Sequence, residues 1–355
     1  MIEIDGSYGE GGGQILRTAI ALSALAMIPI RITNIRAGRP KPGLKRQHMA
    51  GIELISRFAN AEVKGLEVGR TELEFSPRKL TGNHFKYDVG TAGSISLVLQ
   101  AVFPVAVLSP VPVQFTVSGG TDVRWSPPID YLRAVFANHL RKMGAIIEIT
   151  TVRRGHYPRG GGIVSCEVTP AEKLAPIDIV EFGDIKQVAG ISHCIRLPSH
   201  VAERQASAAR ALLQEASLGQ ATIEIESHDE KDDQHVDPGS GIVLWAESES
   251  GLRIGADELG EKGVSAEEVG RKCARRLVKE MASGMAADSH LADMLVPYLA
   301  LADGTSKVGV SQISEHLRTN AWVAKQILDS DIEIKENADG TNLLIAHGIG
   351  LSLRE

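Results

Sequence analysis

The stretch GEGGGQILR, residues 9–17, combines a run of glycines, one carboxylate and the start of a predicted helix. Backbone N–H groups at a helix N-terminus attract anions such as phosphate, and glycine lets an anion approach the backbone closely. A carboxylate beside bound phosphate is repelled unless a cation lies between them, so Glu10 indicates a Mg²⁺ ion shared with phosphates. The spacing matches neither a Walker A loop nor a dinucleotide-binding fingerprint. A tight packing turn, with Glu10 as a helix-dipole partner, remains the alternative.

Positive charge is concentrated in the same part of the chain. No acidic residue occurs between Glu10 and Glu53, but seven basic residues do: Arg17, Arg31, Arg36, Arg39, Lys41, Lys45 and Arg46. Five of these lie in the loop IRAGRPKPGLKRQH, residues 35–48. Arginine binds phosphate bidentately and lysine supplies a point charge, so this patch favours a phosphate-bearing ligand. The alternative is a solvated basic surface loop.

Four further stretches place polar residues at the ends of predicted elements. In VGTAGSISLVLQ, Gln100 lies inside an apolar helix and must find partners there. The sequence of the loop VSGGTDVRWSPP is equally typical of a structural turn and of a turn that carries catalytic residues. In ADSHLADMLVPYLALADG, the residues His290, Asp293 and Met294 share one helical face. In SQISEHLRTNAW, His316 opens a predicted helix.

His316 is the candidate nucleophile of this set. A single histidine is more often structural, but imidazole can attack an electrophile directly. No serine or cysteine has triad-like partners, so acyl transfer has little support. If phosphates converge on His316, a phosphorus atom is the natural target.

Composition limits the class of protein. The chain has 355 residues, 43% apolar and 23% charged, with a mean hydropathy of −0.03, which predicts a soluble globular protein of about two domains. A net charge of −6 argues against a generally basic nucleic-acid binder, and 4% aromatic residues argue against stacking on many bases. We expect neither a membrane-spanning helix nor a secretory signal. The three cysteines, Cys166, Cys194 and Cys273, form no disulfide pattern and fit a reducing cytoplasm.

The order strand, helix, strand, helix, strand, strand occurs three times. The first unit spans about residues 1–80, the second about 81–170, and the third is split into residues 171–184 and 285–355. In the three units together, apolar periodicity predicts helices over Gln14–Ala26, Leu44–Ala59, Ser94–Leu108, Pro128–Met143, His290–Leu301 and Glu315–Leu328. Three units of one order indicate an internal repeat.

The interruption, residues 185–284, has a pattern of its own. It predicts strands over Val188–Ile195, Ala221–Glu226 and Gly241–Ala246 and helices over Val201–Leu213 and Ala266–Met281. This is enough for an inserted small α/β domain. Its acidic loop contains His228, Asp232 and His235, which we interpret as part of a solvated linker rather than a metal site.

These motifs together resemble those of RNA 3′-terminal phosphate cyclases. The matching stretches, in order over nearly all of the chain, are DGSYGEGGGQILR, IRAGRPKPGLKRQH, GTAGSISLVLQ, VSGGTD, HYPRGGG, HVAER, HLADMLVPYLALADG and EHLRTN. The resemblance implies an α/β (α+β) fold of three βαβαββ repeats, like the C-terminal domain of translation initiation factor three. It also implies an inserted thioredoxin-like domain. The expected division is residues 1–184 plus 285–355 for the catalytic domain and 185–284 for the insert.

The resemblance further implies a ligase-type reaction in RNA processing. A histidine attacks the α-phosphorus of ATP, forming histidinyl-AMP and releasing pyrophosphate. AMP then passes to the RNA 3′-phosphate, and the neighbouring 2′-hydroxyl attacks to give a 2′,3′-cyclic phosphate and free AMP. The expected partners are ATP, RNA 3′-phosphate ends and Mg²⁺ or Mn²⁺, in the cytoplasm, with no membrane and a homodimer as one option.

Site residues are carried over from the resemblance position by position. His316 matches the adenylated histidine and Glu10 the metal ligand. The expected nucleotide-binding residues are Arg17, Gln100, Pro127, His290, Leu291, Ala292, Asp293 and Met294. The expected RNA-binding residues are Arg39, Arg46 and Gln47.

Two positions depart from the family pattern. His290 stands where some members carry a tyrosine that stacks on adenine, and Met294 stands where glutamine is common. Two other functions remain open. One is a non-catalytic RNA-binding or ribosome-assembly relative, which the presence of His316 argues against. The other is an enolpyruvyl-transferase-like enzyme on a related repeat fold.

Overall fold

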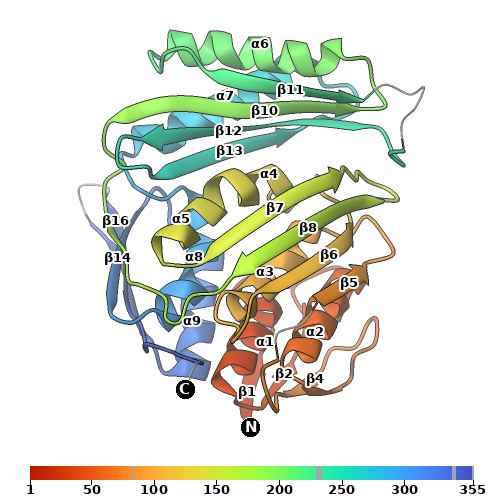
Figure 1. Cartoon of the computed structure of the whole chain (residues 1–355), viewed down its shortest axis with the longest axis vertical. Helices are drawn as coiled ribbons and strands as arrows, with labels where there is room; N and C mark the ends of the chain where they lie inside the picture. The colour runs from red at the N-terminus through yellow and green to blue at the C-terminus, as the bar shows by residue number, and fades with distance from the viewer. Residues whose placement is uncertain (82–83, 229–233, 338–340, 354–355) are drawn as a thin grey trace.

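The computed structural model of the chain describes residues 1–81, 84–228, 234–337 and 341–353. Within these ranges the strands form four four-stranded sheets, and each sheet mixes parallel and antiparallel pairing. Helices cover the sheets (Figure 1). The α/β class predicted from the sequence is confirmed. Among the described helices, none is long and apolar enough to cross a membrane.

Three of the sheets form the body of the molecule and share one strand order. The first sheet contains β1 (Ile2–Asp5), β2 (Ile30–Thr33), β4 (Leu73–Ser76) and β3 (Glu62–Lys64). The second contains β5 (His84–Asp88), β6 (Val113–Gly119), β8 (Gly162–Thr169) and β7 (Ile146–Arg153). The third contains β9 (Asp178–Ile179), β14 (Thr305–Val310), β16 (Asn342–His347) and β15 (Asp331–Glu336). In each, the two strands named first pair in parallel. The other two pairings in each sheet are antiparallel.

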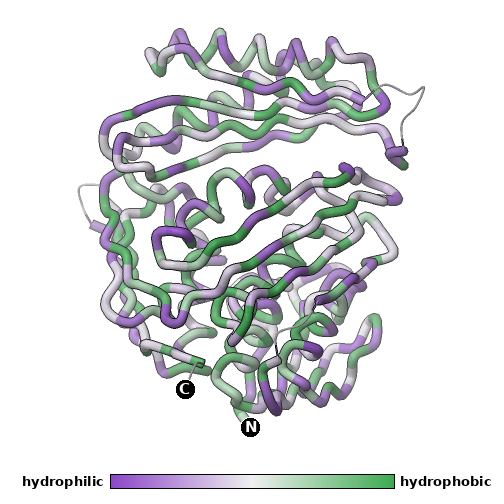
Figure 2. The backbone as a smooth tube through the Cα atoms, viewed as in Figure 1, coloured by the Kyte–Doolittle hydropathy of each residue, from purple (hydrophilic) through white to green (hydrophobic). Residues whose placement is uncertain are grey.

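Five helices meet in the interior of this body. They are α1 (Gln14–Ala26), α2 (Arg46–Phe58), α3 (Ile95–Ala106), α8 (Ser289–Leu301) and α9 (Glu315–Leu328). Helix α1 contacts α2, α3 and α9, and α8 contacts both α3 and α9. Strongly apolar stretches of α1, α3 and α8 explain this central position, since most of their side chains are buried. Hydrophobic segments accordingly gather in the middle of Figure 2, whereas α6 at the top alternates in hydropathy.

The sequence predicts one helix over residues 128–143, and the structure is continuously helical from residue 129 to residue 142 but contains a π-helical turn. The segment consists of α4 (Ile129–Tyr131), a π-helical turn (Leu132–Phe136) and α5 (Ala137–Lys142). The backbone of Gly255 lies so close to this segment that a Cβ atom there would lie 2.8 Å from Val135 Cγ2 and 2.9 Å from Tyr131 Cε2.

The fourth sheet is formed by residues of the predicted insert. It contains β11 (Thr222–His228), β10 (Ile185–Ile195), β12 (Gly239–Ser248) and β13 (Arg253–Leu259), in that order. Helices α6 (His200–Glu215) and α7 (Ala266–Ala282) pack together beside it at the top of Figure 1. Apolar side chains from the sheet and both helices form a cluster separate from the main core.

Strand β13 was not predicted. Its sequence RIGADEL carries three charged residues and does not alternate cleanly between polar and apolar residues. Alternation is the pattern by which a half-buried strand is recognised in a sequence, so this strand gives no clear signal. Its position matters, because β13 pairs with β12 and its backbone contacts the body at Gly255.

Candidate active site

Three of the predicted site residues meet at the surface: Glu10, Arg39 and His316. Arg39 donates a hydrogen bond of 3.1 Å to Glu10 Oε2, and the same oxygen lies 3.7 Å from His316 Nδ1. All three side chains are about two-fifths exposed. A carboxylate, a guanidinium and an imidazole therefore face one shared, solvent-accessible space.

The start of α9 places His316. Ser314 caps the helix, since its Oγ accepts a 2.9 Å hydrogen bond from the N–H of Leu317. The same hydroxyl donates to Asp293 Oδ1 on α8. Helices α8 and α9 are thus joined next to the imidazole.

Asn320, one helical turn after His316, ties α9 to α1 and α8. Its side chain is fully buried. Its Oδ1 accepts hydrogen bonds from Gln14 Nε2 at 2.9 Å and Thr18 Oγ1 at 2.7 Å, and its Nδ2 donates to the carbonyl of Asp293 at 2.7 Å. Because α1 begins directly after the glycine run, this cluster orients the run toward His316.

A small cavity lies beside this cluster. It is lined by Gln14, Arg17, Thr18, Gln100, Phe136, Asp293, Met294, Pro297 and Tyr298, and its volume is about 10 Å³. Gln100 is half-buried, and its Nε2 contacts Met294 Sδ at 3.1 Å, so the glutamine does find a partner. The cavity has room for little more than one water molecule.

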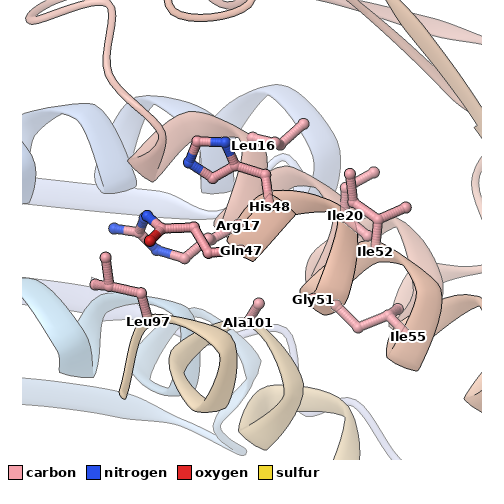
Figure 3. Close-up of a pocket in the computed structure, with 10 residues that line it drawn as sticks. All are labelled: Leu16, Arg17, Ile20, Gln47, His48, Gly51, Ile52, Ile55, Leu97 and Ala101. Carbon is pink, nitrogen blue, oxygen red and sulfur yellow. The ribbon is translucent and has the colours of Figure 1, made fainter. Parts of the chain in front are cut away.

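Arg17 lies between this cavity and a second one of about the same volume. Burial lowers the pKa of Arg17 to about 10. Its Nε has no hydrogen-bond partner in the described part of the chain, while Nη2 donates to Gln14. Figure 3 shows Arg17 and Gln47 side by side in the second cavity, with His48 nearby. A charged group that is buried and incompletely paired is suited to an incoming anion.

His48 is a buried neutral imidazole at the start of α2. Burial, with the charge of Arg17 next in size, lowers its pKa to about 3. Its Nδ1 accepts a 3.1 Å hydrogen bond from the N–H of Lys45. A Cβ atom on Gly13 would lie 2.5 Å from its Nε2, so only glycine fits at this point of the glycine run.

The titration of the site favours a nucleophilic histidine. Burial lowers the pKa of His316 below 6.5, against the opposing effect of the Glu10 carboxylate, so the imidazole is neutral at pH 7. Burial raises the pKa of Asp293 to about 7, and the hydrogen bond from Ser314 opposes this. Neutral His316 keeps a lone pair available for attack.

Comparison with known proteins gives a consistent result. Residues 8–334 match the model of the family described as RNA 3'-terminal phosphate cyclase. Proteins of that name from Methanopyrus kandleri and Ignicoccus hospitalis are 53% and 50% identical, each over 94% of this chain and 95% of their own length. The one from Pyrobaculum neutrophilum is 48% identical over 98% of this chain and 99% of its own.

The chain belongs to the RNA 3′-terminal phosphate cyclase family. Among solved structures, an enolpyruvyl transferase from Streptomyces tendae is similar at a TM-score of 0.38 and 13% identity, covering 99% of this chain and 50% of that one. A likeness at that level supports no argument about fold or function.

The remaining residues predicted for the cyclase site lie in different settings. Leu291 and Ala292 are fully buried in the core, so their side chains contribute to packing. His290 is exposed and its ring meets Tyr131 edge-on at 6.0 Å between centroids. Pro127 is half-buried in the loop after β6.

The two predicted RNA-binding residues on α2 differ in exposure. Arg46 is exposed, and one of its guanidinium nitrogens would lie 3.2 Å from a Cβ atom on Gly90. Gln47 Oε1 accepts a 3.4 Å hydrogen bond from the N–H of Ser94. Both therefore lie near the loop that opens α3.

Three residues of this cyclase-family site were missed from the sequence: Ser314, Asn320 and His48. Ser314 precedes a predicted helix, which is the usual sign of an N-cap, and Asn320 lies on the same helical face as His316. Nothing local marks His48 as buried. Of the loop residues His228, Asp232 and His235, Asp232 lies outside the described residues, and the other two rings are 4.7 Å apart between centroids.

Proposed function

We propose that this protein uses ATP to convert an RNA 3′-phosphate into a 2′,3′-cyclic phosphodiester, with His316 as the nucleophile. The observation that carries the proposal is the solvent-accessible imidazole of His316, whose Nδ1 lies 3.7 Å from Glu10 Oε2, the oxygen that also accepts a hydrogen bond from Arg39. Family membership supplies the reaction, and this geometry is compatible with it.

The first step is attack of His316 on the α-phosphorus of ATP. Nδ1 faces Glu10, which leaves Nε2 as the nitrogen that attacks. A P–N bond forms as the bond to the β-phosphate oxygen breaks, and pyrophosphate leaves. Arg39 stabilises the negative charge that develops on the phosphate oxygens.

We propose Glu10 as a ligand of Mg²⁺ or Mn²⁺. Its carboxylate is accessible and lies at the end of the glycine run, and one carboxylate with substrate phosphates is a common way to hold Mg²⁺. The ion would neutralise phosphate charge during nucleotidyl transfer.

The second and third steps use the same anion-binding surface. The RNA 3′-phosphate attacks the α-phosphorus of the histidinyl-AMP, which returns the electron pair to His316. The 2′-hydroxyl then attacks the 3′-phosphorus, and AMP leaves with the electron pair of the broken P–O bond. We assign the RNA phosphate to Arg39, Arg46 and Gln47.

We propose that the nucleotide binds beside α8. The residues concerned are Arg17, Gln100, Pro127 and the segment His290, Leu291, Ala292, Asp293 and Met294. Gln100, Asp293 and Met294 line one cavity with Arg17, which supports the assignment. At about 10 Å³ this cavity is too small for a base, so binding there requires the lining side chains to move apart.

Covalent labelling tests the proposal directly. The protein is incubated with ATP labelled at the α-phosphate and Mg²⁺ or Mn²⁺, then mapped by mass spectrometry. We expect one AMP on His316, chased into cyclised RNA and free AMP by RNA bearing a 3′-phosphate. His200→Asn is the matched control, since His200 is also exposed in the first turn of a helix.

Two outcomes would overturn the proposal. One is absence of label on the wild type, and RNA binding without label would favour the non-catalytic alternative. The other is label that survives His316→Asn. Turnover of a small phosphorylated alcohol without nucleotide would instead favour an enolpyruvyl-transferase-like enzyme.

We also propose the domain division expected from the sequence, with residues 185–284 inserted into a catalytic domain of residues 1–184 and 285–355. The separate apolar cluster of the fourth sheet supports it. A cytoplasmic location fits the three buried thiols, Cys166, Cys194 and Cys273. A homodimer stays a prediction.

A further inference from the structure

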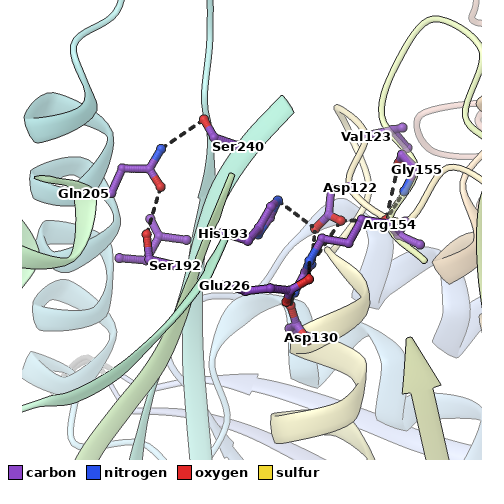
Figure 4. A network of polar contacts seen from close by, with 12 residues as sticks. Asp122, Val123, Asp130, Arg154, Gly155, Ser192, His193, Gln205, Glu226 and Ser240 are labelled. Carbon is purple, nitrogen blue, oxygen red and sulfur yellow. Dashed lines mark hydrogen bonds and ion pairs between the residues drawn. The ribbon is translucent and has the colours of Figure 1, made fainter. Parts of the chain in front are cut away.

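A buried polar cluster lies where the fourth sheet meets the body, away from His316. It contains Asp122, after β6, His156, after β7, and His193, on β10; they are 2%, 5% and 1% exposed. One potential ligand atom of each lies within 4.8 Å of those of the other two. Figure 4 shows His193 directed from the insert's sheet toward Asp122.

The histidines of this cluster have unpaired nitrogens. Among the residues that the structure describes, neither Nδ1 nor Nε2 of His193 has a hydrogen-bond partner, and the same is true of Nε2 of His156. His193 Nε2 is 3.9 Å from Asp122 Oδ1, too far for a hydrogen bond. Buried polar atoms are nearly always paired, because leaving one unpaired costs its full desolvation free energy. Three such atoms in one place indicate that something binds them.

The two histidine side chains of the cluster lie next to each other. Their two rings lie 5.3 Å apart between centroids, at an angle of 29°. Neutral imidazole and carboxylate are the usual ligands of Zn²⁺.

The charges around the cluster leave room for a cation. Arg154 is fully buried and faces three carboxylates: Asp122 at 3.2 Å, Asp130 at 2.6 Å and Glu226 at 2.7 Å. Arg133 also pairs with Asp130, but from a side chain 42% exposed. Glu226 is 31% exposed, but the two buried carboxylates, Asp122 and Asp130, still outnumber the one buried guanidinium, and a divalent ion would offset this charge.

The contacts of Arg154 with Asp122 do not prevent a cation from binding the same carboxylate. It donates to both oxygens of Asp122, at 3.4 and 3.2 Å, and Thr121 donates to Oδ2 at 2.6 Å. Carboxylates that bind metals are usually held by such hydrogen bonds from surrounding groups. His193 and His156 approach the same carboxylate from the insert and from the β7 loop.

We propose that Asp122, His156 and His193 bind a divalent transition-metal ion, with Zn²⁺ as the natural occupant, that fastens the insert to the body. Zn–N bonds of about 2.0–2.1 Å put tetrahedral ligands roughly 3.3 Å apart. The ligand atoms, which lie within 4.8 Å of one another, must approach each other by up to about 1.5 Å to reach this arrangement. His235, which precedes β12 and is 8% exposed, is a further candidate ligand.

A second group of potential ligands provides a control. Asp331, Glu333 and His347 also lie within 4.8 Å of one another, but on a partly exposed sheet surface. There Glu333 pairs with Lys335 at 2.7 Å, and His347 Nδ1 is 2.9 Å from the hydroxyl of Thr305. These groups already have partners, so we infer no metal site from them.

The test uses the full-length protein without nucleotide. After EDTA treatment the protein is equilibrated with Zn²⁺, freed of unbound metal and analysed for zinc by mass spectrometry, with its melting temperature measured in parallel. We expect one zinc per chain and a higher melting temperature for the wild type, and loss of both in His193→Ala and Asp122→Asn. His347→Ala should retain both.

Two further measurements keep the outcome clear. With cobalt in place of zinc, the wild type should show the intense visible absorption of a tetrahedral site. This measurement does not depend on whether any variant folds. Glu10→Gln should still bind zinc, because Glu10 belongs to the other site. The proposal is wrong if the wild type retains no zinc, or if Glu10→Gln loses the zinc while His193→Ala keeps it. Neither result bears on labelling of His316.

Discussion

Nδ1 of His316 lies 3.7 Å from Oε2 of Glu10, although the two residues come from opposite ends of the chain. The carboxylate raises the pKa of His316, while burial and the charges of Arg17 and Arg39 lower it. The net result is a lowered pKa, which favours the neutral imidazole. In the mechanism proposed above, Glu10 and Arg39 would therefore act on the nucleophile as well as on phosphate.

Removing each neighbour should shift this pKa in opposite directions. Glu10→Gln removes a stabiliser of the protonated ring, so the pKa of His316 should fall further. Arg39→Gln removes a nearby positive charge, so it should rise. NMR titration of the imidazole without metal or nucleotide measures both. Shifts of the same sign in the two variants would contradict this assignment.

The pH dependence follows from the same shift. Self-adenylation requires neutral His316, so its rate should drop only below pH 6.5. The unfolded chain binds this proton more readily than the folded one, so the His316 contribution to stability also falls as pH decreases below 6.5. If, as the pH is lowered, the rate falls to half of its maximum while the pH is still above 7, the pKa of His316 is raised rather than lowered.

Ser314→Ala should impair chemistry more than substrate binding. It removes the cap of α9 and the hydrogen bond to Asp293, a loss of about 1–2 kcal/mol of stability, and it lets His316 shift. The pKa of Asp293 should rise above about 7, since that bond lowers it. We expect kcat to fall with little change in KM for ATP.

Ser265→Ala is the control for this variant. Ser265 caps α7 in the same way, accepting from the N–H of Glu268, but in the insert. It should lose comparable stability and keep full activity. Equal loss of activity in both would mean that Ser314 acts only through stability.

Asn320→Ala should destabilise the protein by about 2–3 kcal/mol. It leaves the Thr18 hydroxyl, the Gln14 amide and the carbonyl of Asp293 without their buried partner. Urea denaturation of the variant measures the loss. Asn337→Ala, at an exposed position, should change the free energy of unfolding by less than about 0.5 kcal/mol. A similar small change for Asn320→Ala would show that the buried cluster does not hold α1 to α9.

Met294→Gln should alter nucleotide use. The substitution adds an amide beside Gln100 where the thioether accepts one contact. An extra hydrogen bond to the base would contribute about 1 kcal/mol, roughly a fivefold lower KM for the nucleotide that it fits. KM values for ATP and GTP measure this. Met294→Leu, which adds no polar group, should leave the ratio of the two unchanged; a change there would point to packing instead.

Much of the local structure follows from the sequence. The helices Gln14–Ala26 and Glu315–Leu328 begin and end where their apolar periodicity predicts. The acid-free basic stretch, the glycine run and His316 at a predicted helix start mark the candidate site. These signals are local, because helix formation and capping depend on residues within about one turn.

The tertiary structure alone decided which of these residues meet. Packing of α9 against α1 brings His316 to Glu10 and buries Asn320 among Gln14, Thr18 and Asp293. Only the tertiary structure revealed strand β13. It alone also showed the buried cluster of Asp122, His156 and His193, which combines an insert strand with two distant loops. No sequence pattern carries this information, because the contacts depend on how separate elements share one core, and burial then shifts the pKa of groups such as His48 and Asp293.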